Sequence, residues 1–189
     1  MIAYRKVSTN ISMELVSPYN AEIIFKLVEE NRKYLSEYLT WVEKTKNSEQ
    51  IYDNIKKALI DFSEKKSVDY VIREGDEIIG RISIWLNNEN TNTYEIGYWI
   101  IAKKSKKGIT TSCVKEIMKV GIEYMNVEKF EIICVAENIG SNKIAKKIGY
   151  KLEGTKRNAK RVNNIMHDMN EYGMLKSEYE RHRTIASTG

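Results

Sequence analysis

A lysine-rich segment before a helix is the part of the sequence best suited to bind phosphate. Four lysines directly precede Gly108, where a helical pattern begins: Lys103, Lys104, Lys106 and Lys107. The first N–H groups of a helix lack internal partners, and the helix dipole adds to their attraction for anions. The GK[ST] ending of a Walker loop is missing, and so is GxGxxG. The segment therefore predicts a pyrophosphate-bearing ligand other than ATP or NAD.

Size and composition indicate one globular domain. The chain has 189 residues, of which 42% are hydrophobic and 30% charged. No apolar run approaches the ~20 residues that cross a bilayer, and the first residues lack the apolar core of a signal peptide. We therefore expect a single domain over residues 1–189, located in the cytoplasm and without membrane contact.

Cysteines, histidines and charge point to little other chemistry. Cys113 and Cys134 lie in apolar stretches, which predicts reduced core thiols rather than a disulfide or a nucleophile. His167 and His182 belong to no Cys/His cluster, so we expect no metal site. The net charge of +5 is concentrated in the lysine segment, without the interleaved aromatic residues that favour nucleic-acid binding.

The first half of the chain predicts helices and then a strand meander. The expected elements before the meander are a strand over 12–18, a helix from Asn20 to about 35, a short helix or loop over 34–45, and an amphipathic helix capped at 47–48. The last of these carries apolar residues four, four and three apart: Ile51, Ile55, Leu59 and Phe62. Strands over 68–74 and 77–86 flank the hairpin signal Gly75-Asp76, and a third covers 94–101.

The second half alternates helices and strands around the lysine segment. The expected elements are a helix over 108–125, a strand over 129–136, a helix over 141–148, strands over 150–155 and 163–175, and a closing helix or tail over 177–183. The strand over 129–136 is almost entirely apolar, as expected when both faces of a strand are covered. We see no linker or repeat, so the pattern predicts one α/β domain.

Four stretches in this order resemble the GNAT superfamily of acyl-CoA-dependent N-acetyltransferases. They are YLTWV (38–42), YEIGYWI (94–100), KKSKKGITTSCVK (103–115), and AENIGSNKIAKKIGYKLEGTKRNAK (136–160) followed by NNIMHD. The likeness covers about residues 10 to 180 and is greatest to the RimJ/RimL-type branch, which acetylates N-termini of ribosomal proteins and other amines. It implies an α/β (α+β) domain with a mixed, mostly antiparallel sheet that splays at a CoA cleft, helices on both faces, and often a homo-oligomer.

The resemblance implies acetyl-CoA as cosubstrate. Its pyrophosphate would lie on the backbone amides of Lys106, Lys107, Gly108, Ile109, Thr110 and Thr111. The segment Trp99, Ile100 and Ile101 would diverge from Val135 and leave room for the pantetheine arm. Asn138 would bind that arm or hold the opening in shape, and the alternative is that it caps the next helix.

The lysine segment departs from the family pattern Gln/Arg-x-x-Gly-x-Gly/Ala. Ser105 stands first and Thr110 last, and Lys106 occupies a position where the branch normally has glycine. A lysine there can still offer its backbone N–H, but only if its φ stays negative.

Glu95 and Ser141 are the candidate catalytic residues. Acetyl transfer requires a neutral amine, a stabilised oxyanion and a protonated or hydrogen-bonded leaving thiolate. Glu95 resembles the strand glutamate that is the general base of several relatives; the alternative is a cross-strand salt bridge or a polar surface position. Ser141 matches a serine of the branch that is suggested to hydrogen-bond the CoA sulfur. Many relatives instead use a tyrosine on this helix as the acid, at the position that Ala145 occupies here. The alternative for Ser141 is a helix N-cap. A backbone N–H near Trp99 or Ile100 would bind the oxyanion.

Lys160 occupies the position of a catalytic glutamate in some Rim-type enzymes. Lysine cannot replace a carboxylate base at neutral pH unless its pKa falls greatly. Either Glu95 is the base, or the acceptor amine arrives neutral. An α-amine, with a pKa near ~8, needs less help than a lysine side chain near ~10.4, which favours a protein N-terminus or another amine of low pKa.

Aromatic residues are expected in the acceptor pocket. The candidates are Trp41, Tyr98, Trp99 and Trp85, of which Trp85 fits core packing better. Asp168 matches the usual aspartate of the branch and would either orient the amine or brace the segment after Gly154.

Two other functions stay open. A CoA-binding sensor or partner-docking module without catalysis is suggested by Ser105, Lys106 and Lys160. A basic nucleic-acid-binding domain is the more distant alternative, because its lysines are confined to one segment.

Overall fold

An eight-stranded mixed sheet forms the centre of the protein. The computed structural model describes the backbone of residues 2–187 and the side chains of residues 2–181. The strands are β1 (Tyr4–Lys6), β2 (Ile11–Leu15), β3 (Ser67–Glu74), β4 (Glu77–Asn88), β5 (Thr93–Ile100), β6 (Lys129–Val135), β7 (Lys151–Val162) and β8 (Ile165–Leu175). Their order is β1-β2-β3-β4-β5-β6-β8-β7, and every neighbouring pair is antiparallel except β5–β6. The predicted meander and mixed, mostly antiparallel sheet are confirmed.

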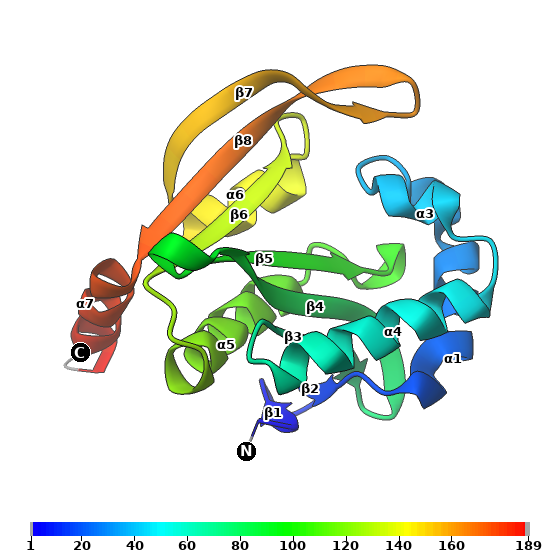
Figure 1. Ribbon diagram of the computed structural model, residues 1–189, viewed down its shortest axis with the longest axis horizontal. Helices are drawn as coiled ribbons and strands as arrows, with labels where there is room; N and C mark the ends of the chain where they lie inside the picture. The colour runs from blue at the N-terminus through cyan, green and yellow to red at the C-terminus, as the bar shows by residue number, and fades with distance from the viewer. Residues whose placement is uncertain (1, 188–189) are drawn as a thin grey trace.

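Helices cover both faces of this sheet, as predicted (Figure 1). They are α1 (Ala21–Glu30), α2 (Arg32–Leu35), α3 (Thr40–Lys44), α4 (Ser48–Ser63), α5 (Ile109–Tyr124), α6 (Ile139–Ile148) and α7 (Lys176–Ser187). Short 3-10 turns occupy Pro18–Asn20, Glu89–Thr91 and Ala102–Lys104. Asn47 caps α4 by accepting from the N–H of Gln50, and the expected stripe of α4 faces the core through buried Ile51 and Ile55. Cys113 and Cys134 are buried free thiols, as predicted.

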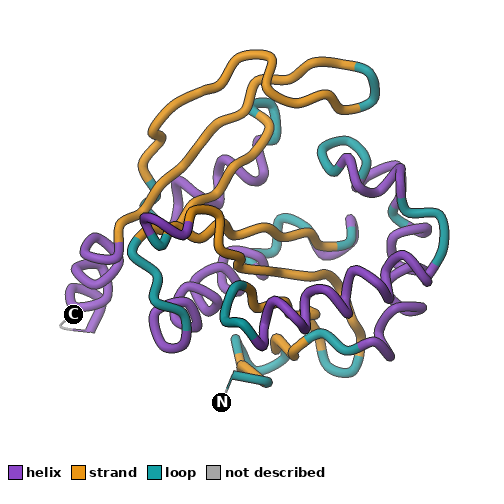
Figure 2. Tube along the Cα trace, in the orientation of Figure 1, coloured by secondary structure: helices purple, strands orange, loops and turns teal. Residues whose placement is uncertain are grey.

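The sheet opens between β5 and β6. These strands pair over only three residues each, Thr93 to Glu95 with Lys129 to Glu131. The β4–β5 ladder continues to Ile100, so the second half of β5 has a partner on one side only. The strand traces diverge from this point in Figure 2. The splayed sheet implied by the family resemblance is therefore present.

Some element boundaries differ from the sequence predictions. The helix expected to 35 breaks at Asn31, whose side chain donates to Leu27 and accepts from the N–H of Ala102. The strand expected to end at 155 continues to Val162, through register shifts that place Asn158 in the left-handed region. Asn163 and Asn164 both have positive φ and close a hairpin with β8. The segment between 156 and 161 has no alternating pattern, so its strand character was not visible in the sequence.

None of the helices that the structure describes is long and apolar enough to cross a membrane.

Candidate active site at the strand gap

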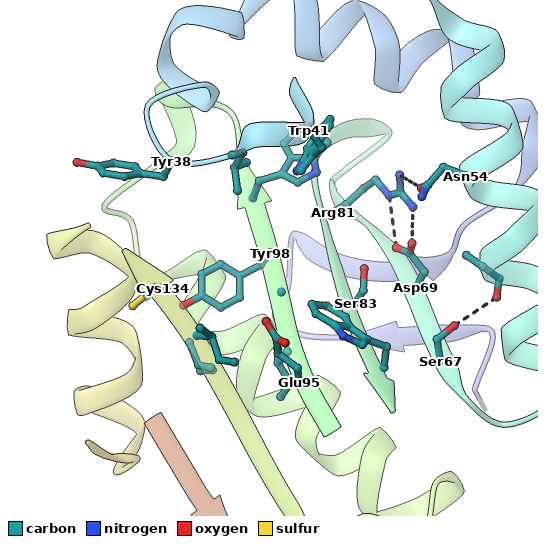
Figure 3. Close-up of a pocket in the computed structure, with 18 of the residues that line it drawn as sticks. Tyr38, Trp41, Asn54, Ser67, Asp69, Arg81, Ser83, Glu95, Tyr98 and Cys134 are labelled. Carbon is teal, nitrogen blue, oxygen red and sulfur yellow. Dashed lines mark hydrogen bonds and ion pairs between the residues drawn. The ribbon is translucent and has the colours of Figure 1, made fainter. Parts of the chain in front are cut away.

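A cavity of about 1040 Å³ passes through the opening between β5 and β6. Residues of α3, α4 and the strands β3 to β6 line it, and the β7–β8 hairpin contributes Lys160 and Met169. Glu95 and Tyr98 of β5 both face the cavity (Figure 3). Because they are three residues apart on a strand, they approach it from opposite faces of the sheet. The site thus joins the two faces at one point.

The N-terminus of α5 presents unpaired backbone donors. Gly108 is its N-cap, with φ of 78°, and no side chain caps the helix. Among the hydrogen bonds within the described residues, none has a backbone N–H from 106 to 111 as donor. Unpaired amides at a helix start are a site for a phosphate group. The geometry therefore brings together the loop residues that the sequence selected: Lys106, Lys107, Gly108, Ile109, Thr110 and Thr111.

Two features of this loop differ from the family pattern as the sequence suggested it. Lys106 has φ of 61°, so the condition of a negative φ is not met, and a lysine occupies the left-handed conformation that favours glycine. Lys104 pairs with Glu74 and lowers the pKa of that carboxyl through a hydrogen bond, so it is not a free phosphate ligand. Lys103, Lys106 and Lys107 are exposed.

A side chain caps the N-terminus of α6. Asn138 is the N-cap, and its side-chain oxygen accepts from the N–H of Ser141 at 3.0 Å. The alternative that Asn138 caps the helix is confirmed, and the alternative that Ser141 is the cap is wrong, since α6 begins two residues earlier than predicted. The Ser141 hydroxyl instead lies 2.9 Å from the Tyr98 hydroxyl. Burial raises the pKa of the Cys134 thiol, and a hydrogen bond with Ser141 opposes that shift.

Asn142, which sequence reasoning missed, fixes this end of β6. Its amide nitrogen donates to the carbonyls of Val135, Ala136 and Asn138, and its oxygen accepts from Asn170 and Tyr172. A buried side chain with this many hydrogen bonds holds the opening in one shape. Its position beside Ser141 was the only sequence signal.

Glu95 lies in the cavity with an altered acidity. Burial raises the pKa of its carboxyl to about 7, Glu131 adds to the shift, and Lys160 acts in the opposite direction. Among the ion pairs of the described residues, none includes Glu95, so the predicted salt-bridge alternative is wrong. A carboxyl with a pKa near neutrality and a cavity position has the properties of a general base.

The aromatic candidates surround the cavity on the α3 side. The rings of Trp41 and Trp99 lie 6.2 Å apart at 51°. Trp85 lines the cavity and is only partly buried, so the expectation that it belongs to the core is wrong. Its indole lies against Gly97, where a Cβ atom would come within 2.7 Å of the ring.

Asp168 lies elsewhere. Its carboxylate accepts from the N–H of Asn158 at 2.9 Å and it is not among the residues that line the cavity. This position fits the bracing of the segment after Gly154 and not an acceptor-orienting role.

A polar cluster on the cavity floor was also missed. Arg81 of β4 pairs with Asp69 of β3, and its second terminal nitrogen donates to Asn54 of α4 at 3.2 Å (Figure 3). The three residues are far apart in sequence and carry no motif, so only the fold reveals them. Among the described residues, we find no group of His, Cys, Asp and Glu that could hold a metal ion.

Comparisons with known proteins agree with this geometry. Residues 13–151 match the family described as acetyltransferase (GNAT) domain. The putative ribosomal N-acetyltransferase YdaF of Bacillus subtilis (strain 168) is 25% identical over 93% of this chain and 96% of its own. The ribosomal-protein-serine acetyltransferase of Escherichia coli (strain K12) is 24% identical over 90% and 95%.

Solved structures support the fold. RimL, a ribosomal-protein α-N-acetyltransferase in complex with coenzyme A, has a TM-score of 0.87 at 22% identity and covers 93% of this chain and 99% of its own. The microcin C7 self-immunity acetyltransferase MccE, in complex with acetyl-CoA and AMP, has a TM-score of 0.85 at 24% identity, covering 93% and 97%. At these identities the likeness establishes the fold.

Proposed function

Because this chain belongs to the GNAT family of acetyltransferases, we propose that it transfers the acetyl group of acetyl-CoA to the N-terminal α-amine of a protein. The observation that carries the proposal is the single cavity through the β5–β6 gap, which reaches Glu95 on one face of the sheet and Tyr98 and Ser141 on the other. The names of the relatives, several of them ribosomal-protein acetyltransferases, support this acceptor class.

The residues present fit CoA. The unpaired amides from 106 to 111 suit its pyrophosphate, and the unpaired side of β5 suits the amides of its pantetheine arm. The N–H of Ile101 donates to Ile79 on the β4 side, so by alternation the N–H of Ile100 points to the gap. Ile100 rather than Trp99 is therefore the better oxyanion donor. Acetyl-CoA supplies the activated thioester.

Glu95 would accept the proton of the acceptor amine, directly or through a water. With a pKa of about 7, its carboxylate is largely ionised slightly above neutrality, close to the ~8 of an α-amine. Matched acidities make this proton transfer nearly balanced. Lys160 would keep Glu95 ionised, because its positive charge lowers the pKa of the carboxyl.

Ser141 would hydrogen-bond the departing sulfur. Burial raises the pKa of Tyr98, so its phenol stays protonated and would donate to the Ser141 hydroxyl, although either hydroxyl can be the donor in this pair. The Ser141 hydroxyl is then free to turn its own proton toward the sulfur. Hydrogen bonds to charged groups are about twice as strong as neutral ones.

The test is release of CoA thiol from acetyl-CoA with a panel of peptides, each offered with a free and with a blocked α-amine. Mass spectrometry then locates the acetyl group. Acetylation of the free α-amine supports the proposal. Acetylation restricted to lysine side chains or small amines refutes the acceptor class, and tight CoA binding without turnover indicates a CoA-binding module instead.

A further inference from the structure

Arg81, Asp69 and Asn54 form a polar cluster on the floor of the acceptor side of the cavity. Strand pairing places Arg81 opposite Trp99, and Glu95 opposite Trp85. Residues at every second position share a face, so Arg81 and Glu95 look into the same side of the cavity. The Arg81 row and the Glu95 row are four positions apart on β4, which corresponds to about 13 Å at ~3.3 Å per residue. Gly97 lies between these rows, and the indole of Trp85 packs against it.

The cluster leaves unused hydrogen-bond donors on residues that line the cavity. Arg81 donates Nε and Nη2 to the Asp69 carboxylate and Nη1 to the Asn54 oxygen. A guanidinium has five N–H groups, so one remains on each terminal nitrogen. Within the described residues these two N–H groups and the Asn54 amide nitrogen have no protein acceptor. Donors of this kind suit a carboxylate, whose oxygens only accept hydrogen bonds.

The charges around the cavity favour the same kind of ligand. Five lining residues are basic and three are acidic. The basic ones are Lys44, Lys57, Lys66, Arg81 and Lys160, and the acidic ones are Asp61, Asp69 and Glu95. A net positive cavity repels polyamines and attracts an acceptor that carries a negative charge beside its amine.

A buried ion pair on a sheet face is a poor way to stabilise a fold. Arg81 is 8% and Asp69 7% exposed. Well-packed apolar residues in place of such a pair are often neutral or stabilising, because desolvation of both charges offsets their attraction. Its presence at the floor of an acceptor cavity, with donors left over, therefore points to recognition.

We propose that Arg81, oriented by Asp69 and Asn54, selects protein N-termini that carry an aspartate or glutamate directly after the acetylated residue. The backbone rows of Arg81 and Glu95 lie ~13 Å apart along β4. Two extended residues of ~7 Å with a hydrogen bond of ~3 Å at each end cover this separation. This proposal depends on the proposed N-terminal acetyltransferase function.

The first test compares peptides that differ only in Asp or Asn at the second position, with Ser, Ala and Met in turn at the first. Asp and Asn have nearly the same shape, so a difference in rate between the two peptides reports the effect of the negative charge. We expect kcat/KM to be about tenfold or more higher for the Asp peptide, mainly through KM, since charge-assisted contacts to Arg are strong. Equal rates for both peptides overturn the Arg81 proposal while leaving N-terminal acetylation intact. Acetylation of neither, with small amines accepted, overturns both.

The second test changes the charges of the cluster with substitutions of similar size. Asn54→Asp places a carboxylate beside Arg81 from a position open to the cavity, and we expect the Asp-to-Asn ratio to fall close to one. Lys56→Gln alters net charge equally on the same helix, at a residue that does not line the cavity, and should keep the ratio. The double variant Asp69→Asn/Arg81→Gln, which removes both charges, should also bring the Asp-to-Asn ratio of kcat/KM close to one.

A merely structural cluster gives a different result. The Asp69→Asn/Arg81→Gln protein would then lose thermal stability and its Asp-to-Asn ratio would stay as in the unmodified protein. If that double variant does not fold, Asn54→Asp decides alone: an unchanged ratio overturns the proposal, and a collapsed ratio at unchanged acetyl-CoA KM supports it.

Discussion

The proposed cofactor site and the proposed acceptor site are built from different parts of the chain. The proposed cofactor site consists of backbone N–H groups over six consecutive residues, 106 to 111. The proposed acceptor site consists of side chains from separate elements: Asn54 on α4, Asp69 on β3, Arg81 on β4 and Glu95 on β5. A backbone site tolerates substitutions, because every residue except proline offers an N–H. A side-chain site changes its chemistry with each substitution, so we expect acceptor choice to depend on the side chains of the proposed acceptor site.

The substitution with the largest expected effect is Glu95→Gln, at the proposed acceptor site. We expect kcat to fall about 10²- to 10³-fold, because a positioned base contributes at that scale, while acetyl-CoA affinity stays the same. In the unmodified protein, kcat/KM should rise with pH through an apparent pKa of about 7, since only ionised Glu95 accepts a proton. The variant should lack this limb. Initial rates between pH 5.5 and 9 measure both effects, and an unchanged profile removes Glu95 from the mechanism.

Stability provides the control for that variant. Burial raises the folded-state pKa of Glu95 above its ordinary value of 4.5, so the folded state holds the proton more tightly. The resulting stabilisation is complete at low pH and is lost as pH rises toward 7. Glu95→Gln should therefore unfold like the unmodified protein at pH 4 and be more stable at pH 8, on the order of 1 kcal/mol. A lower stability at pH 8 would mean that the activity loss is structural.

Ser141→Ala tests the proposed hydrogen bond between Ser141 and the departing CoA sulfur. We expect kcat to fall about tenfold or more, the value of a hydrogen bond to a charged sulfur. The free energy of unfolding should fall by no more than about 1 kcal/mol, the value of the lost hydrogen bond to Tyr98, because Asn138 and not Ser141 caps α6. Asn138→Ala is the matched variant, and it should lose about 1 kcal/mol of stability. Denaturant titrations with initial rates compare the two, and a stable, fully active Ser141→Ala protein contradicts the sulfur role.

The same contrast explains what the sequence could predict. The cofactor loop, α5 and the flanking strands follow one another along the chain, so their pattern revealed both the fold and the loop. The φ of Lys106 stayed open, because composition does not report a backbone angle that neighbouring turns impose. The Arg81 cluster was invisible, since Asn54, Asp69 and Arg81 meet only when β3, β4 and α4 pack. Glu95 and Ser141 were selected from family resemblance, and their contacts required the structure.

Charge reversal in the loop should have a smaller effect than either catalytic variant. Lys106→Glu with Lys107→Glu leaves the backbone amides in place and removes only long-range attraction. We expect the Kd of CoA to rise about fivefold at low salt and less at high salt, because exposed charges are screened. Lys146→Glu with Lys147→Glu, exposed in the last turn of α6, changes net charge equally and should leave the Kd alone. Calorimetric titration at two salt concentrations measures this, and a loss of binding at both would assign the lysines direct contacts.

Lys160→Met should have the smallest effect on rate and the most specific effect on pH. Lys160 lowers the pKa of Glu95 while burial raises it, so removing the cation leaves burial unopposed. The rising limb of the pH–rate profile should then move to higher pH, with the maximal rate little changed. Lys151→Met removes a lysine of the same hairpin that pairs with Glu178, which does not act on the pKa of Glu95, and serves as the control for lost charge. A limb that moves to lower pH, or only as far as in the control, would mean that Lys160 does not act on Glu95.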